Sequence, residues 1–567
     1  MASPSVKPRA GTRGESSANP QVSHTDRIAS GKLVTRGRRL QKKGDKKAAA
    51  ETYLEAFHRD PHNVEAIKAL GRMLVQLGQR KLALAMFEQA LARNAGDFDI
   101  LVALGNTATQ MQMIDTALKI YYILIERLPD HFIGYNNAAT ALRQLERFDE
   151  GIEMLQNVIP MFPRQAELWN TLATLVNERD GLDAALVFYE EALKFNPRFS
   201  EASSNLARAY DNLGQCGKAV EVAEKAIRVK PDFTEAHHVL GTAYLSLGNL
   251  GRGWDEYEWR KHSERVDATL YTHGFPPWDG SSLKGKSIFA AAEQGIGDEM
   301  LFATCLPDIM AQADRVMIGC DWRLVPTFER SFPGAIVGRY NDIQREAQRI
   351  RHFVWLADHE PADYAIEIGS LPRYLRRSVD DFQPQPDGYL KPDPQRVAFW
   401  RRRYAELGDK PKVGIAWRSG QLTHERSREY TDIKDWAPLF EVGGAHFINL
   451  MYSECEADRA WAREQHGIDI HQWDDVDLRN DIDDVFAMIK ALDLVISPGT
   501  APGMMTVAVG QKWWPLLRIR PWWCFGTDRM PMSDQVSINI IPEGGNWTTL
   551  MESVARDFRR FAADHRK

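Results

Sequence analysis

Residues 197–231 read PRFSEASSNLARAYDNLGQCGKAVEVAEKAIRVKP and carry the pattern that decides the fold of the first half of the chain. Two prolines, Pro197 and Pro231, bound this stretch and stand 34 residues apart. The same interval places prolines at Pro61, Pro129 and Pro163, and Ala95 occupies the one position that lacks a proline. A fixed period of this length indicates a repeated structural unit, because an irregular helical bundle has no reason to keep one.

Small residues and larger apolar residues keep the same register. The small positions are Gly37, Gly71, Gly105, Ala139, Ala173, Ala207 and Gly241, then Ala49, Ala83, Ala117, Gly151, Ala185, Ala219 and Gly253; the larger ones include Tyr53, Phe87, Tyr121, Leu155, Tyr189 and Tyr257. Small residues let paired helices approach closely, and proline ends the second helix because it lacks an N–H group. We therefore predict an all-α tetratricopeptide solenoid of about seven repeats over residues 31–262, an architecture that binds polypeptides.

The composition changes after the repeats. Of the 16 tryptophans only Trp169 precedes residue 254, and proline-glycine turn signals begin at residues 275–280. We assign residues 1–30, which are rich in Ser, Pro, Gly, Lys and Arg, to a disordered tail and residues 263–285 to a linker.

Charge and composition also exclude some classes of function. A net charge of −6 argues against nucleic acid as the principal partner, and no stretch approaches the 18 apolar residues that a membrane span needs. The five scattered cysteines fit a reducing cytoplasm, where we expect the protein to act.

The rest of the chain alternates strands with helices. Apolar runs predict strands at residues 286–292, 315–319, 363–368, 412–417, 446–450 and 493–497. They define two successive α/β units, residues 286–390 and 391–567, with a cleft between the carboxyl ends of their strands. The amphipathic segment from Trp547 to the C-terminus is expected to cross back to the first unit.

Several motifs of this half resemble those of a known protein class. The motifs are EQGIGD at residues 293–298, VGIAWRSG at 413–420, ALDLVIS at 491–497 and the junction GWDEYEWR at 253–260. They are similar to bacterial proteins that join tetratricopeptide repeats to a heptosyltransferase-like GT-B glycosyltransferase domain, a double Rossmann fold. Residues 417–420 and the run LRNDIDDV at 478–485 further resemble the flagellin-modifying branch of that group.

The resemblance implies metal-independent transfer of a sugar from a CMP- or UDP-linked co-substrate to a hydroxyl, without a further cofactor. The acceptor would enter over the first α/β unit, at the loop with Gln294, Gly295 and Gly297, and the donor would lie mainly on the second. Asp298 stands where these enzymes carry the aspartate taken as general base, which can accept the proton of a serine or threonine hydroxyl. The alternative is that Asp298 simply caps a helix that begins at Glu299.

One donor loop is predicted at Gly499, Thr500 and Ala501, between a strand and a helix whose N-terminal N–H groups would face a phosphate. The alternative is a tight strand-to-helix turn without a ligand. Many relatives carry an aspartate where this chain has Gly499 and a histidine where it has Met504. This departure puts the donor type, or activity itself, in question.

A second donor loop is predicted at Trp417, Arg418, Ser419 and Gly420, where the Arg418 guanidinium can neutralise a phosphate or a sugar carboxylate. Arg426 and Arg428 follow closely, and three arginines would suit an acidic donor such as a CMP-activated nonulosonate, for example pseudaminic acid. The polar run around Arg426 and Arg428 is equally typical of a solvated loop.

The acidic stretch at residues 474–484 resembles a metal-binding DxD pair. Asp481 and Asp483 precede an amphipathic run, so helix capping explains them, and we predict no metal. From family position, Asn480 and Asp481 are candidates for contacts with the ribose or base of the donor.

Three functions of different classes remain open. The first is a protein O-glycosyltransferase whose solenoid captures a protein acceptor, with flagellin the expected partner and Asn137 and Asn205 placed to bind an extended peptide backbone. The second is an adaptor that keeps the fold without turnover, because of Gly499 and Met504. The third is a glycan-directed transferase that uses its repeats for assembly.

Overall fold

The computed structural model describes residues 22–262, 265, 268–345, 348–420 and 427–565. These residues belong to two compact units, Met1–Leu175 and Val176–Lys567. None of the described helices is long and apolar enough to cross a membrane.

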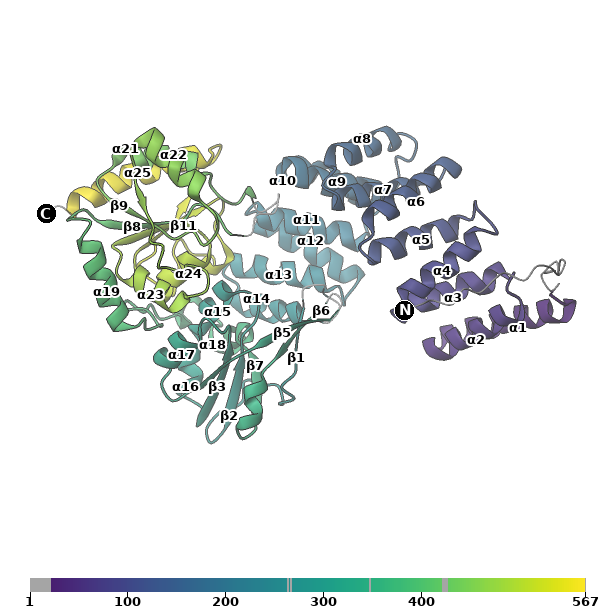
Figure 1. Cartoon of the computed structure of the whole chain (residues 1–567), viewed down its shortest axis with the longest axis horizontal. Coiled ribbons are helices and arrows are strands. Elements are labelled where there is room, and N and C mark those ends of the chain that lie inside the picture. The colour runs from purple at the N-terminus through teal and green to yellow at the C-terminus, as the bar shows by residue number, and fades with distance from the viewer. Residues whose placement is uncertain (1–21, 263–264, 266–267, 346–347, 421–426, 566–567) are drawn as a thin grey trace, which may run out of the picture. The chain divides into compact units, whose positions relative to one another are not determined.

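The described part of the first half of the chain is entirely helical, and its helices follow one another along the chain as seven pairs. Figure 1 labels these helices. The helices are α1 (His24–Lys42), α2 (Lys46–Arg59), α3 (Val64–Gln76), α4 (Arg80–Leu91), α5 (Phe98–Gln110), α6 (Ile114–Arg127), α7 (Phe132–Gln144), α8 (Phe148–Val158), α9 (Ala166–Asp180), α10 (Leu182–Phe195), α11 (Ser200–Asn212), α12 (Cys216–Val229), α13 (Thr234–Ser246) and α14 (Leu250–Tyr257). The predicted solenoid of about seven repeats is therefore confirmed.

The prolines and the first small residue of the repeat have the packing roles that we expected. Pro61 and Pro231 stand two residues beyond the ends of α2 and α12. Gly37 lies directly over the ring of Tyr53, since a Cβ atom at Gly37 would lie 2.4 Å from the Tyr53 Cε1 atom. A small residue on the first helix of a repeat thus makes room for the aromatic residue on the second.

The structure corrects the boundary of the N-terminal tail. The Ser23 hydroxyl accepts a hydrogen bond from the backbone N–H of Asp26 at 3.0 Å, and α1 begins at the next residue, His24. Residues 24–30, which we assigned to the disordered tail, are therefore helical because Ser23 supplies an N-cap. Residues 1–21 lie outside the described part of the chain.

The second half alternates strands and helices. Its strands are β1 (Thr269–Tyr271), β2 (Ser287–Ala291), β3 (Arg315–Cys320), β4 (Ile336–Arg339), β5 (Asn341–Arg345), β6 (Gln348–His352), β7 (Tyr364–Glu367), β8 (Lys412–Ile415), β9 (His446–Asn449), β10 (Ile470–His471), β11 (Leu494–Pro498), β12 (Trp513–Leu517) and β13 (Asn539–Ile540). Its helices are α15 (Ile296–Ala303), α16 (Leu306–Met310), α17 (Val325–Ser331), α18 (Leu371–Leu375), α19 (Pro394–Ala405), α21 (Ala437–Val442), α22 (Glu456–His466), α23 (Ile482–Lys490), α24 (Ala501–Ala508) and α25 (Trp547–Asp564).

All six strands predicted from apolar runs are present, and they belong to two parallel sheets. The first sheet has the order β4-β3-β2-β7 and the second has the order β10-β9-β8-β11-β12-β13. In both sheets the chain starts in the middle, moves outward to one side and then returns to the other side. This doubly wound order is typical of nucleotide-binding α/β folds.

The segment at residues 263–285 is more than a linker. Its strand β1 pairs in parallel with β6, and β6 pairs with β5 as an antiparallel hairpin, which gives a separate three-stranded sheet. The sequence of β5 and β6 is rich in Arg, Asn, Asp and Gln and has no apolar alternation, so no strand was predicted there.

The last repeat shares a hydrophobic core with the α/β half. Trp254 of α14 is 1% exposed, packs edge-on against Phe302 and Trp522, and donates its indole N–H to the carbonyl of Arg376 at 2.8 Å. The compact units consequently divide between residues 175 and 176, inside the repeats, and not at residue 262.

The C-terminal helix does not return to the first α/β unit as we expected. Helix α25 packs against α21 and against the short helix at Ile433–Trp436, and its Phe558 contacts Phe447 of β9. The apolar face of α25 predicted correctly that it is buried, but it did not specify the partner, which is the second sheet.

Candidate functional site

The two parallel sheets both change winding direction at their central strands. The change falls between β2 and β7 in the first sheet and between β8 and β11 in the second. Ligands of doubly wound folds bind outside the carboxyl ends of the strands at this point. The loops after β2, β8 and β11 are therefore the expected site, and they contain the three glycine-containing motifs of the sequence.

These loops line a cleft of about 820 Å³. The first sheet contributes Gly295, Ile296, Gly297 and Arg323; the second contributes, among others, Arg418, Ser419, Gly420, Arg479, Gly499, Thr500 and Ala501. The cleft is of the size that small-molecule sites commonly have, roughly 300–1,000 Å³. The structure thus brings together Gly295 and Gly297 with six of the nine residues predicted for the donor.

Two helix N-termini open onto the cleft. Helix α15 begins at Ile296 after Gly295, and helix α24 begins at Ala501 after Thr500. The two helices pack against each other. The first N–H groups of such helices have no intrahelical partner, and the helix dipole favours an anion there.

Asp298 occupies the third position of α15, and its carboxylate accepts a hydrogen bond from the backbone N–H of Gly295 at 3.2 Å. The helix begins three residues earlier than the capping alternative assumed, but the carboxylate does cap its first turn. Burial raises the pKa of Asp298, and the Gly295 hydrogen bond opposes this rise. Asp298 is half-buried and does not itself line the cleft, although the three residues that precede it do.

Gln294 does not face the cleft. Its side-chain amide donates to the Tyr257 hydroxyl at 2.8 Å, and its backbone adopts a φ of 58°, in the left-handed region. It lines a different cavity, of about 480 Å³, together with Arg260 and Tyr271. The expected loop of Gln294, Gly295 and Gly297 is therefore divided between two cavities.

Trp417 was expected to contact the donor, and the structure corrects this. Its side chain is fully buried, its indole N–H donates to the Asp458 carboxylate at 2.9 Å, and its carbonyl accepts from the Thr431 hydroxyl at 2.8 Å. Trp417 therefore supports the loop at residues 417–420 from its buried side. Arg418 does line the cleft and forms an ion pair with the same Asp458.

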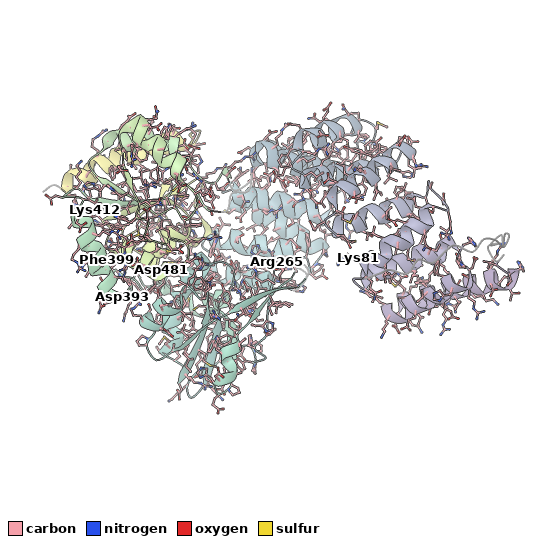
Figure 2. The ribbon with its side chains drawn as sticks, viewed as in Figure 1. Lys81, Arg265, Asp393, Phe399, Lys412 and Asp481 are labelled. Atoms are coloured by element: carbon pink, nitrogen blue, oxygen red, sulfur yellow. The ribbon has the colours of Figure 1, made fainter. Side chains whose placement is uncertain are left out.

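Asn480 and Asp481 are exposed and lie outside the cleft lining. The side chain of Asn480 donates to Asp477 at 2.8 Å. Asp481, which is labelled in Figure 2, caps α23 by accepting from the backbone N–H of Asp484 at 3.2 Å. The expected contacts with the ribose or base are thus replaced by local capping. The preceding residues Leu478 and Arg479 reach the cleft instead.

Arg426 lies outside the described residues. Arg428 is described, and its guanidinium donates to the carbonyls of Asn177 at 2.7 Å and Glu178 at 2.9 Å. It therefore binds the C-terminal end of α9, where a cation is favoured by the helix dipole. It neither faces the cleft nor belongs to a fully solvated loop.

Sequence reasoning missed several cleft residues, among them Arg323, Tyr430, Tyr452 and Arg479. Tyr452 follows the end of β9 by three residues, so the rule that ligands bind at carboxyl ends of strands could have identified it. Arg323 follows β3 in the same way. The arginine donates to Asp321 at 2.8 Å and to the carbonyl of Arg479 at 3.1 Å, which joins the two sides of the cleft.

The structure shows which groups surround Gly499 and Met504, the two positions at which this chain differs from many relatives. Gly499 lines the cleft, and a Cβ there would meet only the side chain of Leu517, at 3.6 Å. Met504 is 8% exposed and packs near Gly297, since its Cγ atom lies 3.9 Å from where a Cβ at Gly297 would be. Met504 is thus a buried contact between α24 and α15.

The carboxylates of the acidic stretch bind neighbouring side chains. Asp483 accepts from Arg330 at 2.8 Å and Asp484 accepts from Arg396 at 2.6 Å and from the Trp400 indole at 3.0 Å. Across the described ranges, no group of three or more His, Cys, Asp or Glu residues is arranged to hold a metal ion.

The two asparagines predicted to bind a peptide are partly exposed on their helices. Asn137 of α7 donates to the Asn106 side chain at 3.2 Å, and Asn205 of α11 accepts from Arg208 at 3.1 Å. They belong to different compact units.

Comparisons with known proteins support the repeat assignment. A family profile described as "Tetratricopeptide repeat" matches residues 34–97, 136–199 and 204–257. Among curated proteins, Protein FlbA of Caulobacter vibrioides (strain ATCC 19089 / CIP 103742 / CB 15) is 35% identical over 314 residues, which span 55% of this chain and 52% of the relative. The chain therefore matches about half the length of that relative.

Solved structures add only weak likenesses. A tetratricopeptide repeat protein from Parabacteroides merdae ATCC 43184 is 18% identical, with a TM-score of 0.36 over 41% of this chain and 91% of that chain. A thermophilic repeat protein of Thermus thermophilus is 24% identical, with a TM-score of 0.30 over 32% of this chain and 99% of that chain. The assignment of the repeats thus rests on the profile and on the helices themselves.

Proposed function

We propose that this chain is a GT-B type glycosyltransferase that transfers a sugar from a nucleotide donor to a serine or threonine of a protein acceptor held by the repeats. The observation that carries the proposal is the cleft at the winding change of two parallel sheets, with glycine-containing loops and two helix N-termini on its walls. Such a site is suited to a nucleotide diphosphate or monophosphate.

The charge of the cleft favours an anionic donor. Three arginines line it, Arg323, Arg418 and Arg479, against one carboxylate, Glu454. Arg323 and Arg418 are partly neutralised by Asp321 and Asp458. Arg479 has no carboxylate partner among the described residues, so its guanidinium is the cation we assign to the donor phosphate or to the carboxylate of a nonulosonate.

Asp298 is the group we assign as general base. It would take the proton of the acceptor hydroxyl as the new bond to the anomeric carbon forms and the bond from that carbon to the donor phosphate breaks. Burial raises the pKa of Asp298, which makes its carboxylate a stronger base than that of an ordinary aspartate. The carboxylate oxygen that does not accept from Gly295 is the one available for this step.

The repeats would select the acceptor. Asn137 and Asn205 are the side chains we assign to the acceptor backbone, and flagellin is the acceptor that the motif resemblance favours. Binding the acceptor to the same chain as the cleft would raise its effective concentration at Asp298.

The surroundings of Asp298 and two differences from many relatives favour a second function. The Asp298 carboxylate caps α15 and does not line the cleft, and Gly499 and Met504 replace the polar residues that many relatives carry. A protein with these features could bind a nucleotide and an acceptor without turnover, as an adaptor.

The test is intact-mass spectrometry of flagellin co-produced with the full chain and incubated with CMP- and UDP-linked sugars. We compare the wild type with Asp298→Asn, because asparagine can still accept the hydrogen bond from Gly295 but cannot act as a base. The matched control is Asp435→Asn, where the carboxylate caps its own helix by accepting from the backbone N–H of Asp432 at 2.8 Å, away from the cleft.

The proposal expects a sugar increment with wild type and with Asp435→Asn, and a loss of about a hundredfold or more in rate with Asp298→Asn. An increment that persists in Asp298→Asn removes the assigned base. Flagellin binding without any increment favours the adaptor, and a sugar increment on a saccharide but not on protein favours a glycan-directed enzyme.

A further inference from the structure

A second cavity, of about 480 Å³, borders the same turn as the cleft. Gln294 lines this cavity, whereas the next residues, Gly295 and Gly297, line the cleft. Its other walls come from helix α13, from the short helix Glu258–Lys261 and from the three-stranded sheet, all within the second compact unit. The turn that precedes Asp298 is therefore a wall that the two cavities share.

The three-stranded sheet contributes one of its faces to this cavity. In the register of the sheet, Arg349 of β6 stands opposite Thr269 of β1 and Gln344 of β5. Residues paired in this way present their side chains on the same face, and all three line the cavity. A guanidinium between a hydroxyl and an amide is well suited to bind a phosphate or a carboxylate.

The guanidinium of Arg349 is available to such a ligand. Its side chain is 50% exposed, and its Nε atom lies 4.0 Å from the Asp342 carboxylate, which is too long for a hydrogen bond. The same carboxylate accepts a hydrogen bond from Arg351 at 3.1 Å. Asp342 thus serves mainly as the partner of Arg351, and it neutralises Arg349 only in part.

The short helix Glu258–Lys261 supplies two further cations that are already fixed in position. Arg260 donates to Glu293 at 2.9 Å, and Lys261 donates to Glu367 at 3.0 Å. Both also pair with Glu258, at 2.9 Å and 2.8 Å. These ion pairs reduce the net charge of the wall, but a ligand would bind there without first ordering two long side chains.

The lining as a whole favours an anion of small size. Among the described residues it contains four cationic side chains, those of Arg260, Lys261, Arg265 and Arg349, and one carboxylate, that of Glu293. Arg265 is labelled in Figure 2. A cavity lined mainly by one sign of charge concentrates ions of the opposite sign. Its volume lies in the range of small-molecule sites, roughly 300–1,000 Å³.

Arg351 connects the cavity to the turn. It follows Arg349 by two residues on β6, so both side chains lie on the same face, and it is 1% exposed. Its guanidinium donates to the carbonyls of Ala292 at 2.7 Å and Gln294 at 2.9 Å. Gln294 has a φ of 58°, a conformation that is costly for a residue other than glycine. An anion on Arg349 would therefore bind about 7 Å along the strand from the residue that holds this strained turn.

We infer that this cavity is an anion site separate from the cleft, that it takes a small molecule with two or more phosphate or carboxylate charges, and that its occupant stiffens the turn before Asp298. The site itself does not depend on the proposed function. Its influence on transfer rests on the proposed function, because that influence requires Asp298 to act as the base.

Titration calorimetry of the full-length protein tests the site, with pyrophosphate and citrate as probes. Saturating CMP or UDP is present in each titration to occupy the cleft. Arg349→Gln and Lys261→Gln each remove one cation of the cavity, and Arg402→Gln removes an exposed cation of α19 as the matched control. Arg479→Ala removes a cation of the cleft.

We expect wild type, Arg402→Gln and Arg479→Ala to bind a probe with equal affinity, and Arg349→Gln and Lys261→Gln to bind it about tenfold more weakly. Preference for pyrophosphate would assign a phosphorylated ligand, and preference for citrate a carboxylated one. Binding that is weakened by Arg479→Ala but not by Arg349→Gln would place the anion in the cleft and overturn the site, as would the absence of binding by either probe.

Hydrogen exchange and transfer rates test the link to the turn. In wild type the bound probe should slow amide exchange in the peptide that contains residues 292–298, and in Arg349→Gln it should not. Unchanged exchange despite binding that depends on Arg349 would overturn the stiffening of the turn. If wild type binds the probe through Arg349 but transfers no sugar to flagellin, the proposed function fails and the anion site stands. If transfer occurs and the probe does not bind, the reverse holds.

Discussion

The carboxyl of Glu299, next to Asp298 in α15, lies 2.9 Å from the hydroxyl of Tyr340 and is 0% exposed. Its other oxygen accepts from the backbone N–H of Asp321 at 2.9 Å. Burial raises the pKa of Glu299 to about 8, so the folded protein keeps a proton here at neutral pH. The first turn of α15, beside the cleft, therefore contains an uncharged, protonated carboxyl group, that of Glu299.

A first prediction concerns stability and pH. Above its ordinary pKa the unfolded chain releases the proton of Glu299 while the folded chain keeps it. The free energy of unfolding should thus fall by about 1.4 kcal/mol per pH unit as pH rises from about 5 to 8. Urea unfolding of Glu299→Gln should show a weaker fall than wild type, with the exposed Glu552→Gln as control. Equal slopes in all three proteins would contradict the prediction.

A second prediction concerns the pH dependence of transfer. Because burial raises the pKa of Asp298, the deprotonated base should be lost at a higher pH than for an ordinary aspartate. The rate of the sugar increment should fall as pH is lowered through that raised pKa, and Asp298→Glu should retain some activity with a shifted profile. Flat profiles in both proteins would show that Asp298 is not the titrating base.

A third prediction separates two adjacent residues. Arg479 lines the cleft, whereas the side chain of its neighbour Asn480 bonds to Asp477. Titration calorimetry with CMP and UDP should give an affinity about tenfold weaker in Arg479→Ala, because a charge-assisted contact to phosphate is lost. Asn480→Ala should bind as wild type does; the reverse order would restore the original assignment of Asn480.

A fourth prediction uses two glycines of the same helix. A Cβ at Gly37 would lie 2.4 Å from Tyr53, whereas a Cβ at Gly31 would meet nothing within 4 Å. Gly37→Ala should destabilise the first repeat by about 1–3 kcal/mol through overpacking. Gly31→Ala should stabilise it by about 0.5–1 kcal/mol, because alanine favours the helix. Thermal unfolding followed by circular dichroism measures both, and equal effects would show that Gly37 has no steric role.

A fifth prediction tests the junction at Trp254. Replacing this buried side chain, as in Trp254→Ala, should cost about 3–5 kcal/mol in the second compact unit. Trp322 is 51% exposed, so Trp322→Ala should change stability by at most about 0.5 kcal/mol. Tryptophan fluorescence during denaturant unfolding measures the difference, and a tolerated Trp254→Ala would mean that the junction is loosely packed.

The sequence predicted those parts of the fold that a local pattern determines. The proline period and the pairing of Gly37 with Tyr53 depend on residues close in sequence, and the repeats follow from them. The central strands β2 and β11 are buried on both faces, so their apolar runs are unambiguous. The strand β12 escaped prediction because Pro515 lies within it, and β5 because its residues are polar.

The site was predicted less completely than the fold. Glycine loops after strands identified the cleft, since the position of a loop follows from topology. The direction of a side chain depends on contacts distant in sequence: Trp417 turns inward because Asp458 accepts its N–H, and Arg479, not Asn480, faces the cleft. Catalytic use of Asp298 stays a prediction.

The burial of Trp254 among Phe302 and Trp522 has a practical meaning for exchanging parts between proteins. A chimaera cut at residue 262 would expose a large apolar surface on both fragments. Joining foreign repeats ahead of Val176 would leave the last repeats with the α/β half, on which they are built. The early repeats could then be exchanged as one piece, while α11 and α13 keep the packing that they have within the second compact unit.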